Sequence, residues 1–356
     1  MLDKIRLEIE TDDQIYEIEF GQAQVEITGR CNMRCQHCRA ANQMLHDMPQ
    51  GQIMKIVRFF QRFGSPESEL VLSGGEPLLY LGLEQVLTTI REAGIDYVTI
   101  TTNGSLLAEK HLRLIEQLAF KSFCLSVSID SIDPLTHDQF RMHEGAFKKA
   151  DAALRLASKS NIPGLVVCVR STIPPSRIGE INRLVDYARA MGCARIGFSA
   201  IHPVGRAKHR NDLLMMAEQK TAFLEEIYRI HGLYSDINVG TNDPLKCLFR
   251  NNSQATNCTD LVFNGCGAGV TTFNVDSDGN MTPCALLDIP IMNIFSMSVE
   301  EMIERYQESP IVRQLLARNF KGKCGLCPMK YECGGCRARA YAESNDFLQS
   351  DPHCLI

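Results

Sequence analysis

The chain has 356 residues, of which 45% are hydrophobic and 22% charged, so it is long enough to bury a large core. Its formal net charge is -5, from 37 basic and 42 acidic residues, and it lacks a block of Lys and Arg. This balance excludes a protein that binds nucleic acid through its phosphates. Charges interrupt the N-terminal segment, and no apolar run approaches the roughly 20 residues that span a bilayer. We therefore expect a cytoplasmic protein with no membrane partner.

Short β-rich runs alternate with segments of helical periodicity between residue 22 and about residue 200, which predicts βαβ units and a parallel sheet. A sheet with one helical layer, closed as a full or partial barrel, follows from this order. Chemistry in such folds lies at the C-terminal ends of the strands. The six expected strands are Ala23–Ile27, Leu70–Ser73, Tyr97–Thr101, Phe123–Ile129, Leu165–Val169 and Arg195–Ser199, and the expected helices are Met54–Phe63, Leu83–Ala93, Ala108–Leu118, Phe147–Ser158 and Ile178–Ala190.

The composition changes along the chain and predicts more than one domain. Residues 1–210 form the expected α/β core domain, and residues 211–250 form a helical linker with one helix over 213–231. From 251 to 356 the chain is rich in Cys, Gly, Asn and Asp with short elements. We predict a smaller cysteine-rich domain there.

Fifteen cysteines in a chain without an export signal call for an explanation, because structural disulfides are rare in a reducing compartment. Metal or cluster ligation is the alternative. Three cysteines fall between Cys31 and Cys38, and nine fall between Cys247 and Cys354. The remaining three, Cys124, Cys168 and Cys193, lie in or beside apolar runs and are interpreted as core residues.

The first cysteine group follows the first strand, with spacings of three and two residues between Cys31, Cys35 and Cys38. Such a loop can wrap three thiolates around one four-iron cluster and leave one iron open for chemistry. A zinc site is the alternative, and it would need a fourth ligand such as His37 or His46.

Polar residues end several of the later strands. After the second strand, the glycines of Ser73-Gly74-Gly75-Glu76-Pro77 permit close backbone approach, and their carbonyls or the Glu76 carboxylate can accept hydrogen bonds from an ammonium group. The alternative is an ordinary strand-end turn. Further polar strand ends are Thr101-Thr102-Asn103-Gly104, Ser126-Val127-Ser128-Ile129-Asp130, Arg170 and the segment from Ile201 to Ala207 with His202. Each of these could equally be a satisfied polar residue near the core, and Asp130 to Asp133 could cap a helix.

The cysteine loop and the Gly-Gly-Glu-Pro segment together resemble the radical SAM superfamily. The resemblance implies a partial (β/α)6 TIM-like barrel and a 4Fe-4S cluster on Cys31, Cys35 and Cys38. It also implies that S-adenosyl-L-methionine (AdoMet) binds the open iron and is reductively cleaved to a 5'-deoxyadenosyl radical. By the same resemblance the cofactor-binding residues are Gly74, Gly75, Glu76, Asn103, Ser126, Ser128, Asp130 and Arg170. Arg39 departs from the family, in which Tyr is frequent after the third cysteine.

The C-terminal cysteines resemble the SPASM extension of radical SAM enzymes, with a final spacer of two residues rather than three. The resemblance implies two auxiliary 4Fe-4S clusters, and hence three clusters in all. Their ligands would be Cys258, Cys266, Cys284 and Cys336 for one and Cys324, Cys327, Cys333 and Cys354 for the other. A pair of zinc sites is the alternative. Cys247 is left over as a structural residue, an alternative ligand or a hydrogen donor in catalysis.

From these features we predict an oxidoreductase that abstracts a hydrogen atom from a small molecule, such as an alcohol or a sugar. The net reaction would be an oxidation or an epimerisation. The short segment before Cys31 leaves little room for a peptide-binding domain, which favours the small molecule. The first alternative is a maturase that modifies a peptide or protein side chain. An external electron donor such as flavodoxin or ferredoxin is expected in both cases. The second alternative is a zinc-stapled, non-enzymatic binding protein.

Overall fold

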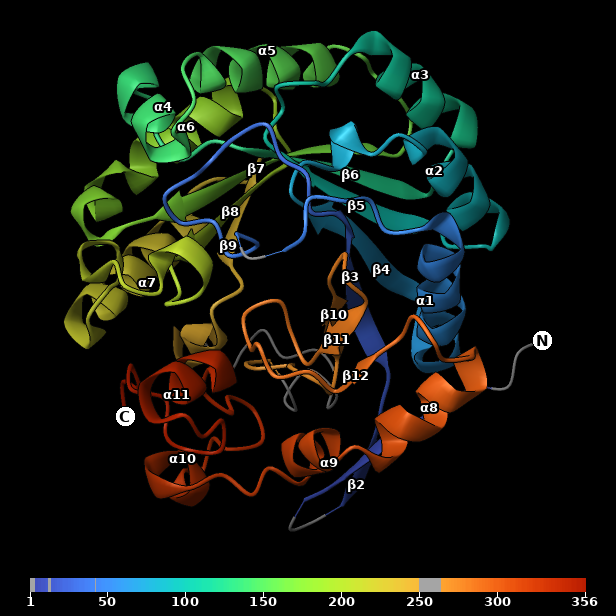
Figure 1. The fold of residues 1–356 in the computed structure, drawn as a ribbon. Helices are drawn as coiled ribbons and strands as arrows, with labels where there is room; N and C mark the ends of the chain where they lie inside the picture. The colour runs from blue at the N-terminus through green and yellow to red at the C-terminus, as the bar shows by residue number, and fades with distance from the viewer. Residues whose placement is uncertain (1–3, 12–13, 42, 250–263) are drawn as a thin grey trace.

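The computed structural model describes residues 4–11, 14–41, 43–249 and 264–356, and it is built on one large sheet (Figure 1). The strand order is β12-β11-β10-β3-β4-β5-β6-β7-β8-β9, and β3 to β9 pair in parallel. The parallel strands are β3 (Phe20–Thr28), β4 (Gly64–Gly74), β5 (Tyr97–Thr102), β6 (Ser122–Ser128), β7 (Leu165–Ile173), β8 (Arg195–Ala200) and β9 (Asn238–Thr241). The six predicted strands and the partial barrel are confirmed.

Helices connect successive parallel strands and lie on one side of the curved sheet, as Figure 1 shows. Each predicted core helix is present within a few residues of its expected bounds. The helices are α1 (Gln50–Phe63), α2 (Leu83–Glu92), α3 (Glu109–Leu118), α4 (Pro134–Arg141), α5 (Ala146–Ser158), α6 (Ile181–Ala190) and α7 (Ala217–His231). Asp133 caps α4, because its side chain accepts a hydrogen bond from the amide of Thr136.

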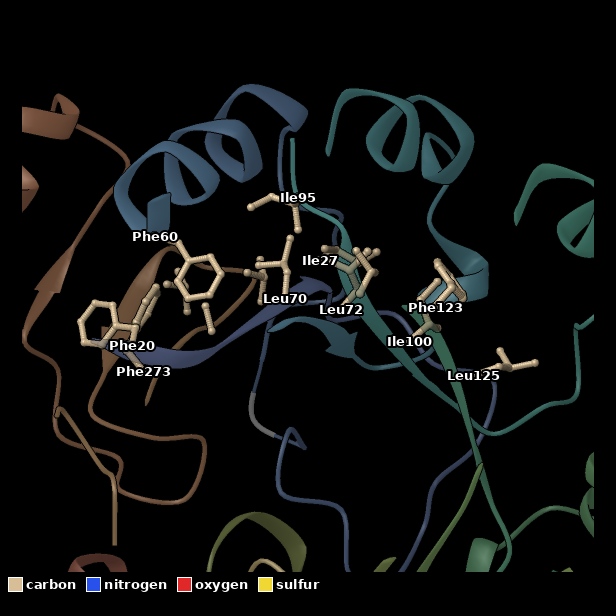
Figure 2. Packing of buried hydrophobic residues seen from close by; sticks show 14 of the residues in the cluster. Phe20, Ile27, Phe60, Leu70, Leu72, Ile95, Ile100, Phe123, Leu125 and Phe273 are labelled. Carbon is tan, nitrogen blue, oxygen red and sulfur yellow. The ribbon is translucent and has the colours of Figure 1, made fainter. Parts of the chain in front are cut away.

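Alternate side chains of the strands pack against the helical layer and form the main core. Leu70, Leu72, Ile100, Phe123 and Leu125 lie on this side of β4, β5 and β6 (Figure 2). The opposite side of the same strands carries polar residues, which therefore face the inside of the partial barrel. This alternation leaves a polar interior below the loops that end the strands.

The C-terminal region extends the edge of the sheet rather than standing apart from it. Strand β10 (Thr272–Val275) pairs in parallel with β3, and β11 (Asn280–Thr282) and β12 (Met292–Asn293) continue outward. Phe273 of β10 packs against Phe20 and Phe59 at this junction. The sheet thus crosses the expected boundaries at residues 210 and 250, and the domain division stays a prediction.

Sequence patterns did not reveal the short outer elements. A hairpin of β1 (Leu7–Glu10) and β2 (Ile15–Ile18) precedes the barrel. The last helices are α8 (Val299–Glu308), α9 (Pro310–Ala317), α10 (Gly322–Leu326) and α11 (Arg337–Ser344). Within the described ranges, none of the helices combines the length and apolar character that crossing a bilayer requires.

Candidate active site

The loop after β3 brings the first three cysteines together over the C-terminal ends of the strands. Cys35 is buried, Cys38 is half-buried and Cys31 reaches solvent. Burial of this loop raises the pKa of the Cys31 thiol, and the neighbouring Cys35 and Cys38 thiols raise it further. The Cys35 and Cys38 thiols are thus close enough to Cys31 to affect its pKa, so the three cysteines lie near one another in this loop.

Hydrogen-bond donors are directed at the sulfur atoms of this loop. The amide of Met33 lies 3.4 Å from Cys31 Sγ, and Nη1 of Arg141 lies 3.8 Å from Cys35 Sγ. Donors of this kind stabilise thiolates and tune the potential of a cluster that the thiolates hold. The side chains present therefore fit an iron-sulfur cluster.

The two glycines after β4 allow that strand end to pass directly beneath the cysteine loop. The amides of Gly75 and Glu76 donate hydrogen bonds to the carbonyls of Thr28 (2.7 Å) and Arg30 (2.8 Å). A Cβ atom at Gly74, where φ is +124°, would lie 2.2 Å from the Thr28 oxygen, and one at Gly75 would lie 2.1 Å from the Arg30 oxygen. No other residue type fits this contact without moving the loop.

Glu76 is buried and joins the second and third strand ends. Its carboxylate accepts hydrogen bonds from the Thr102 hydroxyl (2.6 Å), the amide of Asn103 (2.8 Å) and the amide of Leu78 (3.1 Å). Burial raises the pKa of Glu76, and these three donors oppose the shift. The Asn103 amide group donates to Asn32 Oδ1 at 2.9 Å, so this strand end is also tied to the cysteine loop.

Asp130 lies at the end of the fourth barrel strand and is paired within the protein. Arg141 Nε is 2.6 Å from its Oδ2, and the amide of Thr172 is 2.8 Å from its Oδ1. Burial raises the pKa of Asp130, but Arg141, two nearby histidines and the Thr172 amide together outweigh burial and hold this pKa well below its ordinary value. Arg141 thus bridges Asp130 and Cys35.

The sequence analysis did not identify Arg141. No motif marks it, and the available signal was indirect, because a buried Asp130 requires a counter-charge. An adjacent stack was not predicted either. The ring centroids of His37 and Phe140 are 4.4 Å apart, and Arg177 Cζ lies 4.2 Å from the centroid of the Phe140 ring. This stack fixes the cysteine loop against the end of α4.

The remaining predicted cofactor residues lie on neighbouring strands facing the barrel interior. Ser126 and Ser128 are buried on β6, and Ser128 is in register with Arg170 on β7. The segment after β8 closes over the third cysteine, since the amide of Arg206 donates to the Cys38 carbonyl at 2.9 Å. Burial lowers the pKa of His202 to about 3, so its ring is neutral near pH 7.

The C-terminal cysteines form two neighbourhoods. Cys266 interacts with Cys284 and with Cys336. Cys354 interacts with Cys324 and Cys333, which lie in the second neighbourhood. Cys258 falls outside the described residues. In the part of the chain that the structure describes, no three His, Cys, Asp or Glu side chains surround one point closely enough for a single metal ion.

Further donors point at the sulfurs of the second neighbourhood. The amide of Asp351 and Nη2 of Arg337 both lie 3.4 Å from Cys324 Sγ. The amides of Met329 and Gly335 lie 3.4 Å from the sulfurs of Cys327 and Cys333. This donor set fits a second cluster-binding loop.

Cys247 lies in the second neighbourhood too. Its thiol hydrogen-bonds with Cys333 and lies 3.2 Å from the Pro244 carbonyl. It is buried there. Of the other cysteines, Cys193 is in the main core, whereas Cys124 and Cys168 are buried with their sulfurs 3.1 Å apart.

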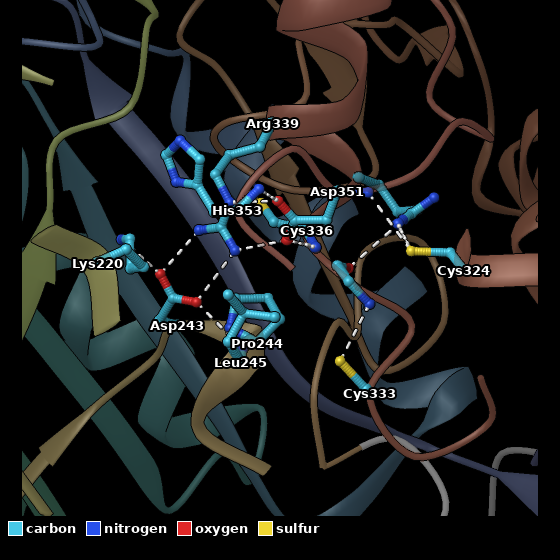
Figure 3. Close-up of polar contacts among 12 residues, drawn as sticks. Lys220, Asp243, Pro244, Leu245, Cys324, Cys333, Cys336, Arg339, Asp351 and His353 are labelled. Carbon is cyan, nitrogen blue, oxygen red and sulfur yellow. Dashed lines mark hydrogen bonds and ion pairs between the residues drawn. The ribbon is translucent and has the colours of Figure 1, made fainter. Parts of the chain in front are cut away.

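A buried ion-pair network connects the barrel to the C-terminal region, as Figure 3 shows. Asp243, just after β9, pairs with Lys220 of α7 and with Arg339 of α11, both at 2.8 Å. Arg339 also pairs with Asp351 at 2.6 Å, and Asp351 accepts the amide of Cys336 at 2.7 Å. Sequence patterns do not indicate this network, because its members are far apart along the chain.

Comparison with known proteins identifies the core. Residues 25–188 match the family model described as the radical SAM superfamily. This chain carries a radical SAM domain. Its matched segment begins in β3 and includes the cysteine loop, the glycine pair and the ends of the next strands.

Two curated relatives from Methanosarcina barkeri match almost the whole chain. The AdoMet-dependent heme synthase is 28% identical over 350 residues, covering 93% of this chain and 95% of the relative. The Fe-coproporphyrin III synthase is 26% identical over 362 residues, covering 93% of this chain and 86% of the relative.

A solved structure shares the fold. Streptococcus suis SuiB bound to the precursor peptide SuiA has a TM-score of 0.76 at 17% sequence identity, covering 96% of this chain and 77% of that chain. The match includes the cysteine-rich C-terminal region. The predicted radical SAM core is therefore confirmed. The likeness to SuiB shows that the fold of the C-terminal region is shared, and the SPASM extension stays a prediction.

Proposed function

We propose that Cys31, Cys35 and Cys38 hold a 4Fe-4S cluster with one open iron, at which this enzyme cleaves AdoMet. The observation that carries the proposal is the hydrogen-bonded contact of the cysteine loop with Gly75 and Glu76. When bound, the cluster and AdoMet would supply a 5'-deoxyadenosyl radical that takes a hydrogen atom from the substrate. The chain's own residues hold the loop, bury Cys35 and present polar groups beneath the loop.

Gly74 and Gly75 leave their backbone accessible beside the loop, so their carbonyls are the proposed acceptors for the methionyl ammonium group. The Glu76 carboxylate already accepts three hydrogen bonds from the protein. We therefore assign Glu76 and Asn103 to holding the strand ends in place, with Ser126 and Ser128 next to the cofactor. Asp130 acts by fixing Arg141 beside Cys35.

Two auxiliary 4Fe-4S clusters complete the proposed cofactor set. The neighbourhood of Cys266, Cys284 and Cys336 supports the first, with Cys258 as its expected fourth ligand. The neighbourhood of Cys324, Cys333 and Cys354, with Cys327, supports the second. The contact of Cys247 with Cys333 supports a place for Cys247 next to this second cluster and removes support for its role as a hydrogen donor.

A small molecule is the proposed substrate and oxidation the proposed outcome. The two relatives named for heme and Fe-coproporphyrin III synthesis, both small molecules, match over most of both chains. A nearby auxiliary cluster could accept the electron left on the substrate, whereas epimerisation would need a hydrogen donor at the substrate. The alternative is a peptide substrate, since the fold is shared with SuiB, whose structure holds a precursor peptide.

Iron and sulfide analysis of the anaerobically reconstituted enzyme tests the cofactor set. Three four-iron clusters require about twelve irons per chain. Replacing Cys31, Cys35 and Cys38 by Ala should remove about four irons and leave the rest, and Cys193→Ala should remove none. Stoichiometric zinc without sulfide would reject the assignment.

The substrate class is tested by product analysis. The reconstituted enzyme is incubated with AdoMet, a reductant and either a candidate small molecule or a peptide encoded near its gene. Hydrogen transfer from a deuterated small molecule into 5'-deoxyadenosine is the expected result. A mass change on the peptide instead would replace the small-molecule proposal with the maturase alternative.

A further inference from the structure

A cavity of about 730 Å³ lies at the β9 edge of the sheet and is lined by residues of β7, β8, β9 and α7. Its volume is in the usual range for small-molecule sites, which is about 300–1,000 Å³. The described residues that line it include three cations, Arg170, Arg195 and Lys246, together with His231. None of the described lining residues is Asp or Glu. The described part of the cavity wall is therefore cationic.

The strand register places two glycines in line with Arg170, and their missing side chains leave the cavity open there. Arg170 on β7 pairs with Gly197 on β8, and Gly197 pairs with Gly240 on β9. A Cβ atom at Gly197 would meet nothing within 4 Å, and one at Gly240 would meet only Asn238 Oδ1 at 3.9 Å. Packing does not require these two glycines, yet they leave free space next to the guanidinium group.

The guanidinium of Arg170 has no carboxylate within ion-pair distance among the described residues. Its Nη2 donates to Ser199 Oγ at 3.0 Å. Burial lowers the pKa of Arg170, and the charge of Arg39 lowers it further. A buried cation without a counter-ion is costly, so its other donors are suited to an anion that enters from the cavity.

Arg170 also connects the cavity with the site described above. It interacts electrostatically with Asp130 and with Arg39, the residue after Cys38. A molecule in the cavity that reaches Arg170 therefore lies close to the cysteine loop. A substrate has to lie there for a hydrogen atom to be transferred.

We propose that this cavity binds a small substrate with several carboxylates and that Arg170 anchors the carboxylate nearest the cysteine loop. Arg195 at the start of β8, which also lines the cavity, is placed for a second anionic group. The inference rests on the proposed function and names its substrate class. It replaces an alcohol or sugar with an anion. It also assigns Arg170 to the substrate, whereas the family resemblance implies a cofactor-binding role in which Arg170 would contact the methionyl carboxylate of AdoMet.

Binding of a matched pair of probes tests this inference. Coproporphyrin III carries four carboxylates, and its neutral tetraamide has nearly the same size and shape. Equilibrium dialysis against the reconstituted holoenzyme should show at least tenfold tighter binding of the acid. Arg170→Gln should weaken binding of the acid at least tenfold and leave the amide unchanged. Gly197→Val, which fills the space, should weaken both probes.

Arg113→Gln is the matched control, because Arg113 is an exposed arginine on α3 and should leave binding unchanged. Equal binding of both probes, or a wild-type affinity in Arg170→Gln, would overturn the inference. Weaker AdoMet binding by Arg170→Gln, with the probe unaffected, would return Arg170 to the methionyl carboxylate. Formation of 5'-deoxyadenosine without substrate is measured in parallel, so a failure of the proposed function is distinguished from a failure of this inference.

Discussion

Arg141 combines structural and electrostatic roles in one side chain. Its guanidinium pairs with the buried carboxylate of Asp130 and also points at Cys35 Sγ. The pKa of Arg141 is raised by these neighbours despite its burial. Arg141, the last residue of α4, therefore supplies the positive charge beneath the cysteine loop.

Replacing Arg141 by Gln should lower the free energy of unfolding by about 3–5 kcal/mol, because Asp130 is left buried without its counter-charge. Denaturant unfolding of the apoprotein measures this change. Arg113→Gln removes an exposed ion pair and should change stability by less than about 1 kcal/mol. A loss that is equally small for Arg141→Gln would show that Asp130 does not depend on this partner.

The buried side chain of His137 should make the stability of the protein depend on pH. Its ring nitrogen Nδ1 accepts the amide of Asp130 at 3.1 Å, and burial lowers its pKa to about 4. In the unfolded chain the pKa of His137 is about 6.5. As the pH falls, the unfolded chain therefore binds a proton at a higher pH than the folded state does. Stability should therefore decrease between about pH 6.5 and pH 4, by about 2 kcal/mol at pH 5 from this group alone.

Urea unfolding at pH 7 and pH 5 checks this expectation. His137→Asn keeps an acceptor for the Asp130 amide but does not titrate, so the loss of stability on acidification should shrink by that amount. His209→Asn, at an exposed position, should retain the wild-type loss. An unchanged loss in His137→Asn would exclude His137 as its source.

Residue-scale features were only partly predictable. The cysteine loop and the glycine pair are local in sequence, and their spacing carries the signal. Arg141 and the space beside Arg170 depend on strand register and on helix α4, which no spacing specifies. Sequence reasoning therefore found the residues proposed as ligands and missed the charges that surround them.

Elements at the barrel mouth are held by close backbone contacts. The contact between Gly75 and the Arg30 carbonyl couples the end of β4 to the cysteine loop. A methyl group at this position must displace one of the two segments. The loop position is thus set by the strand beneath it.

Gly75→Ala should destabilise the protein by about 2 kcal/mol through overpacking and should weaken AdoMet binding. Gly51→Ala provides the control, since a Cβ atom there meets nothing within 4 Å and the residue lies in helix α1. Alanine is the better helix former, so this control should be stabilised by up to about 1 kcal/mol. Chemical denaturation and equilibrium dialysis with AdoMet measure both effects. Normal AdoMet binding by Gly75→Ala would contradict the role given to this contact.

The parallel strands β3 to β8 and the core helices other than α4 were predictable because their hydrophobic patterns are regular. The short strands β9 to β12 were not, since each has four residues or fewer and forms only by adding to an existing edge. Their pairing explains why the C-terminal region continues the barrel sheet. Long-range pairing of this kind leaves little trace in local sequence.

At the scale of the whole molecule, the buried network around Asp243 joins the barrel to the C-terminal region. Asp243 stands between Lys220 and Arg339, and their charges hold its pKa well below the ordinary value despite burial. Arg339 continues to Asp351, which contacts the backbone of Cys336. The position of the C-terminal cysteines thus depends on a carboxylate at the end of the barrel sheet.

Asp243→Asn should lower the free energy of unfolding by about 3–5 kcal/mol, because two buried cations lose their shared counter-charge. Asp346→Asn, which removes the partner of the half-exposed Lys321, should cost less than about 1 kcal/mol. Denaturant titration compares the two. Equal effects would show that the network does not connect the two parts of the molecule.

The central claim is that Cys31, Cys35 and Cys38 hold the cluster at which AdoMet is cleaved. Formation of 5'-deoxyadenosine by anaerobically reconstituted enzyme with reductant tests it most directly. The wild type and Cys193→Ala should form the product, and the variant with all three cysteines replaced by Ala should form none while retaining the iron of the C-terminal region. Continued formation of 5'-deoxyadenosine by that triple variant would contradict the account.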